Sequence, residues 1–493
     1  MNEEDDFADQ LAEEFAPAEL NRGRNGDQPN GGGGADADDD GKRELWEFRI
    51  LQPCTDMGNA VRFRLDNVDV ARFVPGLGWH CWDARRWRPD DDGEAERLAK
   101  ATARRIKVDA AHIIDPDESG AMFKWGLQSQ NAPKLRAMLD LAITERQLVA
   151  RADGLDADPF LLCVENGTLD LRTGQLRPHD PADHITKIAG TNYDPAAVAP
   201  TWLEHLRVIF DGDDDLAAYL QRWVGYCLTG DVTEQCLMLS QGDGENGKTT
   251  TWETISRVLG DYARGADAHT FTTAASDRAA RSDIARLQGA RLVTTDEITA
   301  GAHLAEGLVK QLTGGDRIVA RFLYHGEFEF VPVLKLCLSV NHLPAISGGD
   351  HAIWRRIRVI PFEQRITKPD KRFAGKLRDE LPGVLAWAIE GCVAWQRDGL
   401  GSCAAVERAT GAYRRDQERV TGFLADCCER DMLERVKRSE LLTTYAGWER
   451  AHGRSPLDAK VLYAELRNHG FAEVKSHGER YITGLRLIGD GDV

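Results

Sequence analysis

The residues with the clearest chemical signature form the segment GDGENGKT at positions 242–249, which fits the pattern G-x-x-x-x-G-K-[ST]. Glycines in such a segment let backbone N–H groups close around phosphate oxygens at the start of a helix. An apolar run, CLMLSQG, leads into the segment, and a helical pattern, GKTTTWETISRVLG, follows. Lys248 is placed to reach the β- and γ-phosphates of ATP, and the Thr249 hydroxyl to bind Mg²⁺. The predicted nucleotide contacts are Gly242, Asp243, Gly244, Glu245, Asn246, Gly247, Lys248, Thr249 and Thr250.

Two acidic residues, Asp296 and Glu297, end the apolar run ARLVTTDE, with Asp296 standing 48 residues after Lys248. Ligand sites of open α/β sheets lie at the carboxyl ends of their strands. We therefore expect this pair on a strand that neighbours the strand leading into the glycine segment. Asp296 would hold Mg²⁺ through water, and Glu297 would orient and deprotonate the attacking water.

Three more polar residues follow apolar or helical runs farther along the chain. Asn341 comes after VLKLCLSV, where its amide would hold the attacking water or sense the γ-phosphate. Arg355 and Arg356 stand together in AIWRRIRVIPF. Adjacent arginines that enter a strand are usually surface charge, but here they also suit a finger that reaches the nucleotide site of a neighbouring subunit. Either arginine fits that role.

Basic and aromatic residues gather in GGDRIVARFLYHGEFEFVP, which is typical of two strands joined by a turn at residues 324–326. A hairpin of this kind could follow a phosphate backbone and stack on bases. The alternative is an ordinary exposed hairpin. The predicted DNA contacts are Arg317, Arg321, Tyr324 and His325.

The elements that must position these residues alternate from residue 236 onward between apolar strand-like runs and helical patterns, which predicts a parallel α/β sheet. Short helices and the β-like piece RYITGLRL at residues 416–488 are typical of a small winged-helix module. Upstream, three tryptophans between residues 79 and 87 would either pack in a small β-unit or stack on nucleic acid.

Composition excludes several classes of protein. The chain has 493 residues and a net charge of −18, of which residues 1–41 carry −11 in a segment that we expect to be disordered. A stripe of Phe7, Leu11 and Phe15 would let part of that segment dock on a partner as a short helix. No run of 18 apolar residues and no secretory signal is present, which predicts a cytoplasmic protein. Ten cysteines without C-x-x-C spacing argue for reduced thiols rather than a zinc site.

In their order, five segments resemble the superfamily 3 helicase domain of the phage/plasmid primase–helicase family, which has poxvirus and satellite-phage relatives. The segments are GDGENGKT, RLVTTDE, KQLTGGDRIVARFLYHGEFEF, SVNHLP and AIWRRIRVIPF. Upstream, TDMGNAVRF, GWHCWDARRW and NGTLDLRTGQLRPHDP resemble the helper domain that precedes such helicases. Downstream, the stretch from YRRDQERVTGFL to YITGL resembles the winged-helix tail of the family.

The resemblance implies an α/β fold, with an AAA+ type P-loop NTPase core, a small α+β helper domain before it and a C-terminal winged-helix module. The expected domains are a disordered acidic tail (1–43), the helper domain (44–200), the helicase ATPase (201–400, with a helical part at 201–235) and the winged-helix module (410–490).

The resemblance also implies an ATP- and Mg²⁺-dependent replicative DNA helicase of a phage, prophage or plasmid. It would form a ring, expected to be a hexamer, and move 3′-to-5′ on single-stranded DNA. Tyr324 and His325 stand where eukaryotic-virus members carry Lys-His, so the histidine matches and the lysine does not. The family roles fall on Lys248 and Thr249 for the phosphate loop, Asp296 and Glu297 for the acidic pair, Asn341 for the sensor and Arg355 or Arg356 for the finger.

Many members of the family begin with a primase-polymerase domain, for which we see no counterpart before residue 44. We therefore expect a separate primase or host replication protein as a partner, beside single-stranded and fork DNA. Two alternatives remain open. One is a primase–helicase that makes its own primers, and the other is an ATP-switched initiator that binds an origin without unwinding it.

Overall fold

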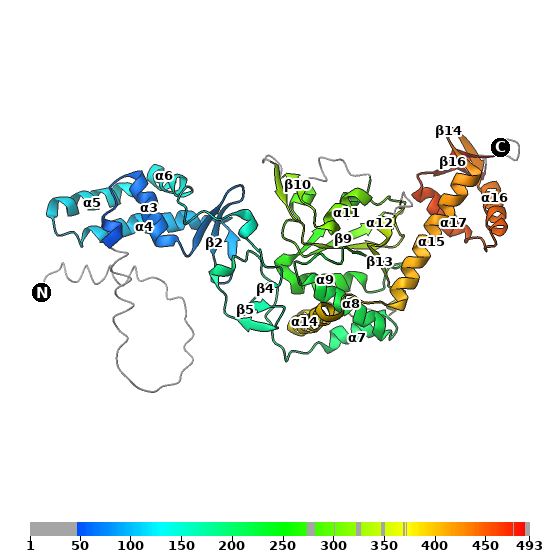
Figure 1. Ribbon diagram of the computed structural model, residues 1–493, viewed down its shortest axis with the longest axis horizontal. Coiled ribbons are helices and arrows are strands. Elements are labelled where there is room, and N and C mark those ends of the chain that lie inside the picture. Colours follow the sequence, from blue (N-terminus) through cyan, green and yellow to red (C-terminus); the bar gives the residue numbers. More distant parts are fainter. Residues whose placement is uncertain are drawn as a thin grey trace. The chain divides into compact units, whose positions relative to one another are not determined.

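The computed structural model describes residues 47–273, 282–299, 301–321, 327–346, 351–367, 370, 372–476 and 478–488. The chain forms two compact units, residues 1–152 and 153–493, which we treat separately (Figure 1). The predicted acidic tail, with its stripe of apolar residues, and the predicted DNA contacts Tyr324 and His325 lie outside the described residues.

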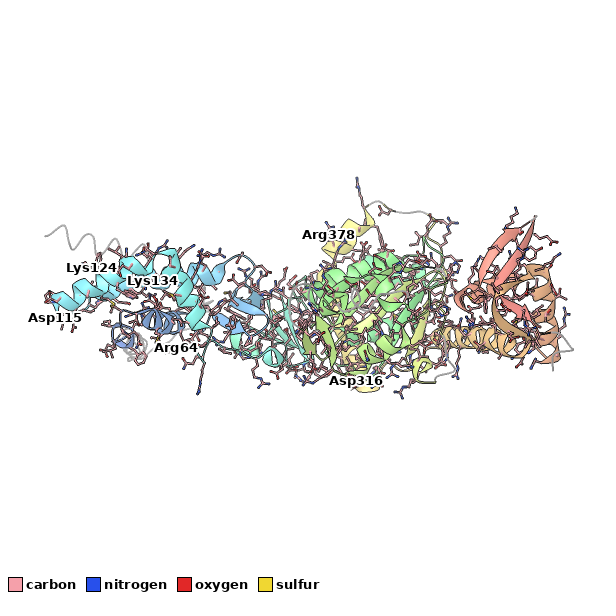
Figure 2. The ribbon with its side chains drawn as sticks, turned by 90° about the horizontal axis from the view of Figure 1, so that it is seen from above. Arg64, Asp115, Lys124, Lys134, Asp316 and Arg378 are labelled. Carbon is pink, nitrogen blue, oxygen red and sulfur yellow. The ribbon has the colours of Figure 1, made fainter. Side chains whose placement is uncertain are left out.

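In the first unit, the helices α3 to α6 pack beside a small antiparallel sheet with the strand order β1-β2-β3. The helix α5 begins where the Asp115 carboxylate accepts hydrogen bonds from two backbone N–H groups, and Asp115 and Lys134 of α6 are labelled in Figure 2. Lys134 forms an ion pair with Asp56 on α3 (3.0 Å). The elements are α3 (Asp56–Asn67), β1 (Ala71–Val74), β2 (Gly78–Trp82), β3 (Trp87–Pro89), α4 (Glu94–Ala110), α5 (Pro116–Ser129) and α6 (Ala132–Ala142).

Trp79 and Trp87 of this unit pack within it. Trp87 is 1% exposed, and the Trp79 ring meets Phe63 and Phe73 edge-on at 5.6 and 5.4 Å between ring centroids. Of the two alternatives for these rings, packing in a small β-unit is therefore confirmed.

The second unit is built on a sheet of five parallel strands in the order β13-β7-β12-β9-β8, which confirms the predicted parallel α/β sheet. The strands β7, β12 and β13 are mainly apolar and buried because both faces of the sheet are covered. They are β7 (Leu237–Gln241), β8 (Ala263–Ala266), β9 (Leu292–Ile298), β12 (Lys335–Val340) and β13 (Ile357–Pro361).

Successive side chains of each strand enter two different cores. Met238 and Cys337 face a core formed with α7 (Pro200–Ile209), α8 (Asp214–Cys227), α9 (Lys248–Leu259) and α14 (Leu381–Asp398). Leu239 and Leu338 face the other core, which contains α11 (Glu306–Gly314), α12 (His351–Trp354) and the paired strands β10 (Ile318–Arg321) and β11 (Glu327–Phe330). The short helix α13 (Phe373–Asp379) precedes α14.

A second antiparallel sheet, β4 (Leu161–Val164), β5 (Gly167–Asp170) and β6 (Gln175–Arg177), joins the first of these cores. The backbone N–H of Cys163 donates to the Tyr262 hydroxyl (3.1 Å), and Arg291 donates to the carbonyl of Leu161 (2.8 Å). The boundary between the two units therefore falls at residue 152, whereas the sequence suggested a domain boundary at residue 200.

The C-terminal module (residues 404–487) begins with the long helix α15, whose Thr410 hydroxyl accepts a hydrogen bond from the N–H of Val359 on the edge strand β13 (3.0 Å). A separate core includes Phe423, Tyr445 and Leu466. The elements are α15 (Ala404–Cys427), β14 (Cys428–Lys437), α16 (Arg438–Ala451), α17 (Ala459–Asn468), β15 (Ala472–Ser476) and β16 (Glu479–Leu487), with the antiparallel order β14-β16-β15. A winged-helix module consists of helices with a small sheet, and both are present here. The assignment of the C-terminal module as a winged helix stays a prediction.

Among the described residues, no helix combines the length and the apolar character that crossing a membrane requires.

The helices α8 and α14 cross at two glycines. A Cβ atom on Gly225 would lie 2.1 Å from the backbone nitrogen of Cys392, and one on Gly391 would lie 2.1 Å from the carbonyl oxygen of Gln221. Backbone therefore contacts backbone at this crossing.

We predict that Gly225→Ala lowers the free energy of unfolding by about 1–3 kcal/mol, because the two helices must move apart. The control is Gly375→Ala on α13, where a Cβ atom meets nothing within 4 Å. That change should raise stability by up to about 1 kcal/mol, because alanine favours a helix. Denaturant unfolding compares the two variants, and equal effects would contradict the close crossing.

A second prediction concerns Glu465 on α17, whose pKa burial raises to about 7 from its usual 4.5. The unfolded chain releases this proton near pH 4.5 and the folded chain near pH 7, so stability should fall as the pH rises between these values, by about 3 kcal/mol at most. Glu465→Gln should remove that part of the pH dependence. Thermal unfolding of both proteins at pH 5 and pH 8 checks this, and parallel changes in Tm would contradict it.

Candidate functional site

The glycine loop, residues 242–247, joins the carboxyl end of β7 to the start of α9, as the sequence predicts. Gly244 and Gly247 have φ values of 94° and 84°, in the left-handed region that glycine adopts without strain. A Cβ atom on Gly242 would lie 2.1 Å from Asn246 Nδ2 and 2.2 Å from the carbonyl oxygen of Phe362. The loop is therefore closed tightly on itself at the beginning of a helix, which is the geometry that suits an anion.

Two side chains of the loop hold it in place. Asn246 is 4% exposed; its Nδ2 donates to the Phe362 carbonyl (3.0 Å), and its Oδ1 accepts from the N–H of Lys248 (3.4 Å). The exposed Glu245 forms an ion pair with Arg365. Asn246 was predicted to contact the nucleotide, but the structure uses its side chain to fix the loop to the segment that follows β13.

Lys248 lies at the centre of the site. Its side chain is nearly buried, and its Nζ donates to Asn341 Oδ1 (2.9 Å), to the carbonyl of Val340 (3.1 Å) and to the carbonyl of Gly242. Burial lowers the pKa of this amine, and the negative charges of Glu297 and Asp243 partly oppose that change. The structure thus brings together the loop, the amine and Asn341 at one edge of the sheet.

The acidic pair lies near the carboxyl end of β9, but β9 is not the neighbour of β7 that the sequence analysis expected. β12 lies between them, because the strand order is β13-β7-β12-β9-β8. Asp296 and Glu297 are both exposed, although successive residues of a strand normally face opposite sides. The register explains this: Cys337 pairs with Thr294 and Ser339 with Glu297, so β9 carries one extra residue in a bulge next to Asp296.

The two adjacent arginines have different surroundings. Arg356 is 7% exposed, and it donates to Thr313 Oγ1 (3.2 Å) and to the carbonyl of Ala352 (2.8 Å). Arg355 is exposed and contacts Gln235 Oε1 at 3.3 Å. The sequence left the finger role open between them; in the structure Arg356 is held inside the fold, whereas Arg355 is exposed, and the finger role stays a prediction.

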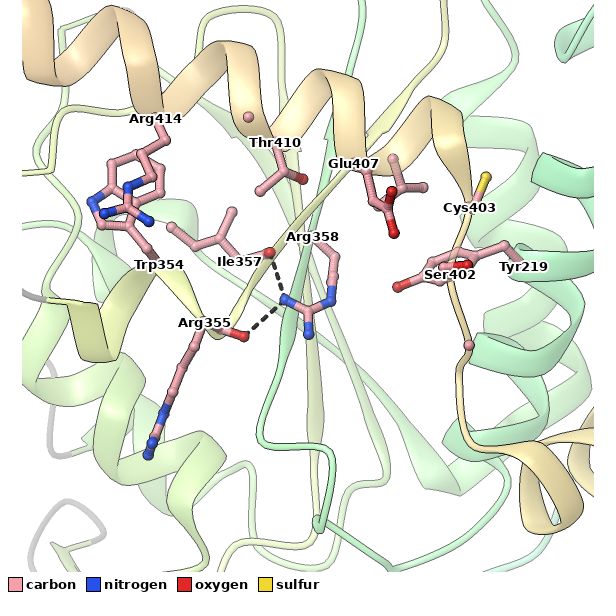
Figure 3. Close-up of a pocket in the computed structure, with 13 residues that line it drawn as sticks. Tyr219, Trp354, Arg355, Ile357, Arg358, Ser402, Cys403, Glu407, Thr410 and Arg414 are labelled. Atoms are coloured by element: carbon pink, nitrogen blue, oxygen red, sulfur yellow. Dashed lines mark hydrogen bonds between the residues drawn. The ribbon is translucent and has the colours of Figure 1, made fainter.

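The backbone at Arg355 is fixed from within the chain. Arg358 donates to the carbonyls of Arg355 (2.8 Å) and Ile357 (2.9 Å), while the Arg355 side chain points away from Arg358 (Figure 3). Ile357 pairs with Leu237 at the start of β7, and the glycine loop follows the other end of β7. The two ends of β7 are four residue steps apart, which corresponds to roughly 13 Å along the strand. Arg355 is thus remote from the glycine loop of its own chain.

The predicted hairpin is present as β10 paired with β11. Arg317 and Arg321 are exposed, as DNA contacts must be. However, Arg321 pairs directly with Glu327, and Val319 with Glu329, and both glutamates are exposed. Two carboxylates therefore share the solvent face with the arginines, which reduces the net positive charge that a phosphate backbone would meet.

The sequence analysis missed one residue beneath the loop. His205 on α7 is 4% exposed, and its Nε2 donates to Thr251 Oγ1 (2.9 Å), which in turn donates to the carbonyl of Gly247 (2.9 Å). Burial lowers the pKa of His205 to about 4, so the ring is neutral at pH 7. A histidine on the buried stripe of α7, beside Trp202 and Leu206, was the available signal.

Comparison with known proteins adds independent findings. Residues 60–211 match the family described as D5 N terminal like, and residues 240–356 match a family of unknown function, DUF5906. A proposed helicase of Acanthamoeba polyphaga mimivirus is 30% identical over 238 residues, which are 48% of this chain and 25% of that protein. A proposed helicase of Frog virus 3 is 27% identical over 385 residues, which are 61% of this chain and 40% of that protein.

A proposed primase of African swine fever virus is 25% identical over 327 residues, which are 60% of this chain and 34% of that protein. The chain thus covers two fifths or less of the length of these three relatives. Among solved structures, the NrS-1 C-terminal region aligns with 59% of this chain and 77% of its own length, at 12% identity and a TM-score of 0.37. Together, the D5 N terminal like match and the viral relatives named as helicases and primases support a relationship to primase–helicases of the D5 type.

Proposed function

We propose that this chain is an ATP-hydrolysing DNA helicase of the superfamily 3 type, from a phage, prophage or plasmid, which works as a ring of identical subunits on single-stranded DNA. The observation that carries the proposal is the meeting of Lys248, Asn341 and the glycine loop at the carboxyl edge of the sheet. The acidic pair stands at that edge one strand farther on. The fold and the family agree with this chemistry.

The residues at this edge fit ATP and Mg²⁺. A Cβ atom at Gly244 would meet nothing within 4 Å, so the backbone of the glycine loop is open there to the approach of phosphate oxygens. Thr249 is exposed in the first turn of α9, and Asp296 is exposed on β9. Magnesium sites of this class use one or two carboxylates beside the phosphates, and the ion neutralises charge on the β- and γ-oxygens.

The side chains then have distinct tasks. Lys248 already donates to three oxygens, and we propose that phosphate oxygens replace some of them when nucleotide binds. Because this amine is nearly buried, its attraction to an anion is stronger than it would be in water. Glu297 is proposed to take a proton from the attacking water, and Asn341 to orient that water.

The proposal of a ring of subunits rests on the position of Arg355. This exposed guanidinium lies at the amino edge of the sheet, whereas the glycine loop lies at the carboxyl edge. We propose that Arg355 reaches the nucleotide of a neighbouring subunit and stabilises charge in its transition state. A closed ring, which we take to be a hexamer, gives every site such a partner. Movement 3′-to-5′ along DNA is part of the same proposal.

The first test separates binding from hydrolysis. We expect Lys248→Ala to lose ATP turnover, because the amine for the phosphates is gone. Glu297→Gln should still bind ATP but hydrolyse it roughly 100-fold or more slowly, because only the proton acceptor is lost. The control is Glu253→Gln on α9, whose exposed carboxylate pairs with Arg257 (3.4 Å) and which should leave turnover near the wild-type rate. Normal turnover by Glu297→Gln would contradict the assignment of the acidic pair.

The second test concerns the finger. Arg355→Ala should fold and bind ATP without hydrolysing it. Mixed with Lys248→Ala protein, it should regain activity, because some interfaces then pair an intact loop with an intact arginine. Arg356→Ala should instead lose about 1–3 kcal/mol of stability, because buried partners lose their donor.

ATPase rates over a series of mixing ratios, with circular dichroism as the folding control, distinguish the two arginines. A linear dilution curve without complementation would rule out Arg355 acting between subunits. Strand displacement on substrates with 3′ or 5′ tails then separates a helicase from an initiator that only assembles on DNA.

A further inference from the structure

The segment that follows Asn341 connects the candidate site to the C-terminal module. Asn341 comes directly after β12, and its side-chain oxygen accepts a hydrogen bond from Lys248. Residues 344–346 after it are buried. Where this segment lies therefore decides where the Asn341 amide lies.

The core of the second unit holds the segment from one side. The N–H of Ala345 donates to the carbonyl of Ala302 (2.8 Å), and the N–H of Leu304 donates to the carbonyl of Ala345 (2.9 Å). These two bonds use both backbone groups of Ala345. Its neighbours on either side need other partners, because buried backbone groups without hydrogen bonds are costly.

The C-terminal module supplies those partners. The Tyr413 hydroxyl on α15 donates to the carbonyl of Pro344, and Gln417 Oε1 on the same helix accepts from the N–H of Ile346 (3.1 Å). Asn468 Nδ2 at the end of α17 donates to the carbonyl of Leu343 (3.4 Å). The three side chains are 2%, 2% and 3% exposed, so these contacts are made away from water.

A second set of contacts ties the two helices together behind the segment. Gln417 Nε2 donates to Glu465 Oε2, and Glu465 lies on α17 three residues before Asn468. Gln417 therefore bonds to the segment with its oxygen and to α17 with its nitrogen. A shift of α17 against α15 cannot leave both bonds intact.

We propose that Tyr413, Gln417 and Asn468 are positioning residues for Asn341, through which the C-terminal module sets the rate of ATP hydrolysis. The proposal rests on the proposed function, because it needs Asn341 to act on the nucleotide or the attacking water. The three side chains hold the backbone that leaves β12, and thereby hold the Asn341 amide at the site. None of them has to touch the nucleotide.

The test uses the full chain and single hydroxyl deletions. Tyr413→Phe removes the bond to Pro344 but keeps the ring, which packs against Trp354 with 5.0 Å between ring centroids. The matched control is Tyr463→Phe, which removes a buried hydroxyl bond to the carbonyl of Arg438 (2.5 Å) inside the same module, away from the segment. We expect kcat for ATP to fall roughly tenfold in Tyr413→Phe, with KM changed less than twofold. Tyr463→Phe should keep both constants.

The decisive measurement adds Asn341→Ala to each variant. If Tyr413 acts only through Asn341, the double variant Asn341→Ala, Tyr413→Phe is no slower than Asn341→Ala alone. If the two substitutions lower kcat independently, so that their fold-reductions multiply in the double variant, the proposal is overturned. Equal kcat values for Tyr413→Phe and Tyr463→Phe would also overturn it. Asn468→Ala provides a second route to the same result if Tyr413→Phe folds poorly, as judged by circular dichroism. Failure of the proposed function can be distinguished from failure of this positioning proposal, because in the former case the wild-type protein would not hydrolyse ATP.

Discussion

The side chain of Lys248 is almost completely buried at the carboxyl edge of the sheet, and the backbone and side chains there supply hydrogen-bond acceptors for its ammonium group. A buried cation needs hydrogen-bond acceptors, and the three that Lys248 finds are neutral oxygens of Gly242, Val340 and Asn341. Two of these belong to the end of β12, so β12 has to lie beside β7. Glu297 on β9 then stands one strand farther away, where its charge partly opposes the lowering of the amine's pKa by burial without replacing the neutral partners. An amine held in this way keeps its positive charge available for an anion.

The local parts of this arrangement could be predicted from the sequence. The glycine pattern, the strand before it and the helix after it are contiguous, so a short window of residues contains all the information. Strand order is different, because the neighbours of a parallel strand are chosen by crossovers that span many residues. The sequence therefore suggested that the acidic strand lies beside the strand leading into the glycine loop, whereas β12 lies between the two strands.

For Arg355 and Arg356, too, the surroundings of each side chain could not be predicted from the local sequence. They are identical residues in one short stretch, and no local pattern separates them. The two arginines are distinguished by Thr313 on α11, 43 residues before Arg356 in the chain, which accepts a hydrogen bond from Arg356 and not from Arg355. The hairpin is similar, since its arginines were visible in the sequence but the pairing of Arg321 with Glu327 depends on register. His205 was hidden because its partner, Thr251, lies on a different helix.

The glycine crossing of α8 and α14 makes the two faces of the parallel sheet mechanically unequal. On one face, backbone touches backbone at Gly225 and Gly391, so these helices have no layer of side chains through which one could slide over the other. On the other face, α11, the paired strands β10 and β11, and α15 meet the sheet through side chains, which can change rotamer. On the face with α8 and α14 the two helices are thus fixed to each other by backbone contact, whereas the face that carries the hairpin and the helix leading to the C-terminal module can adjust through its side chains.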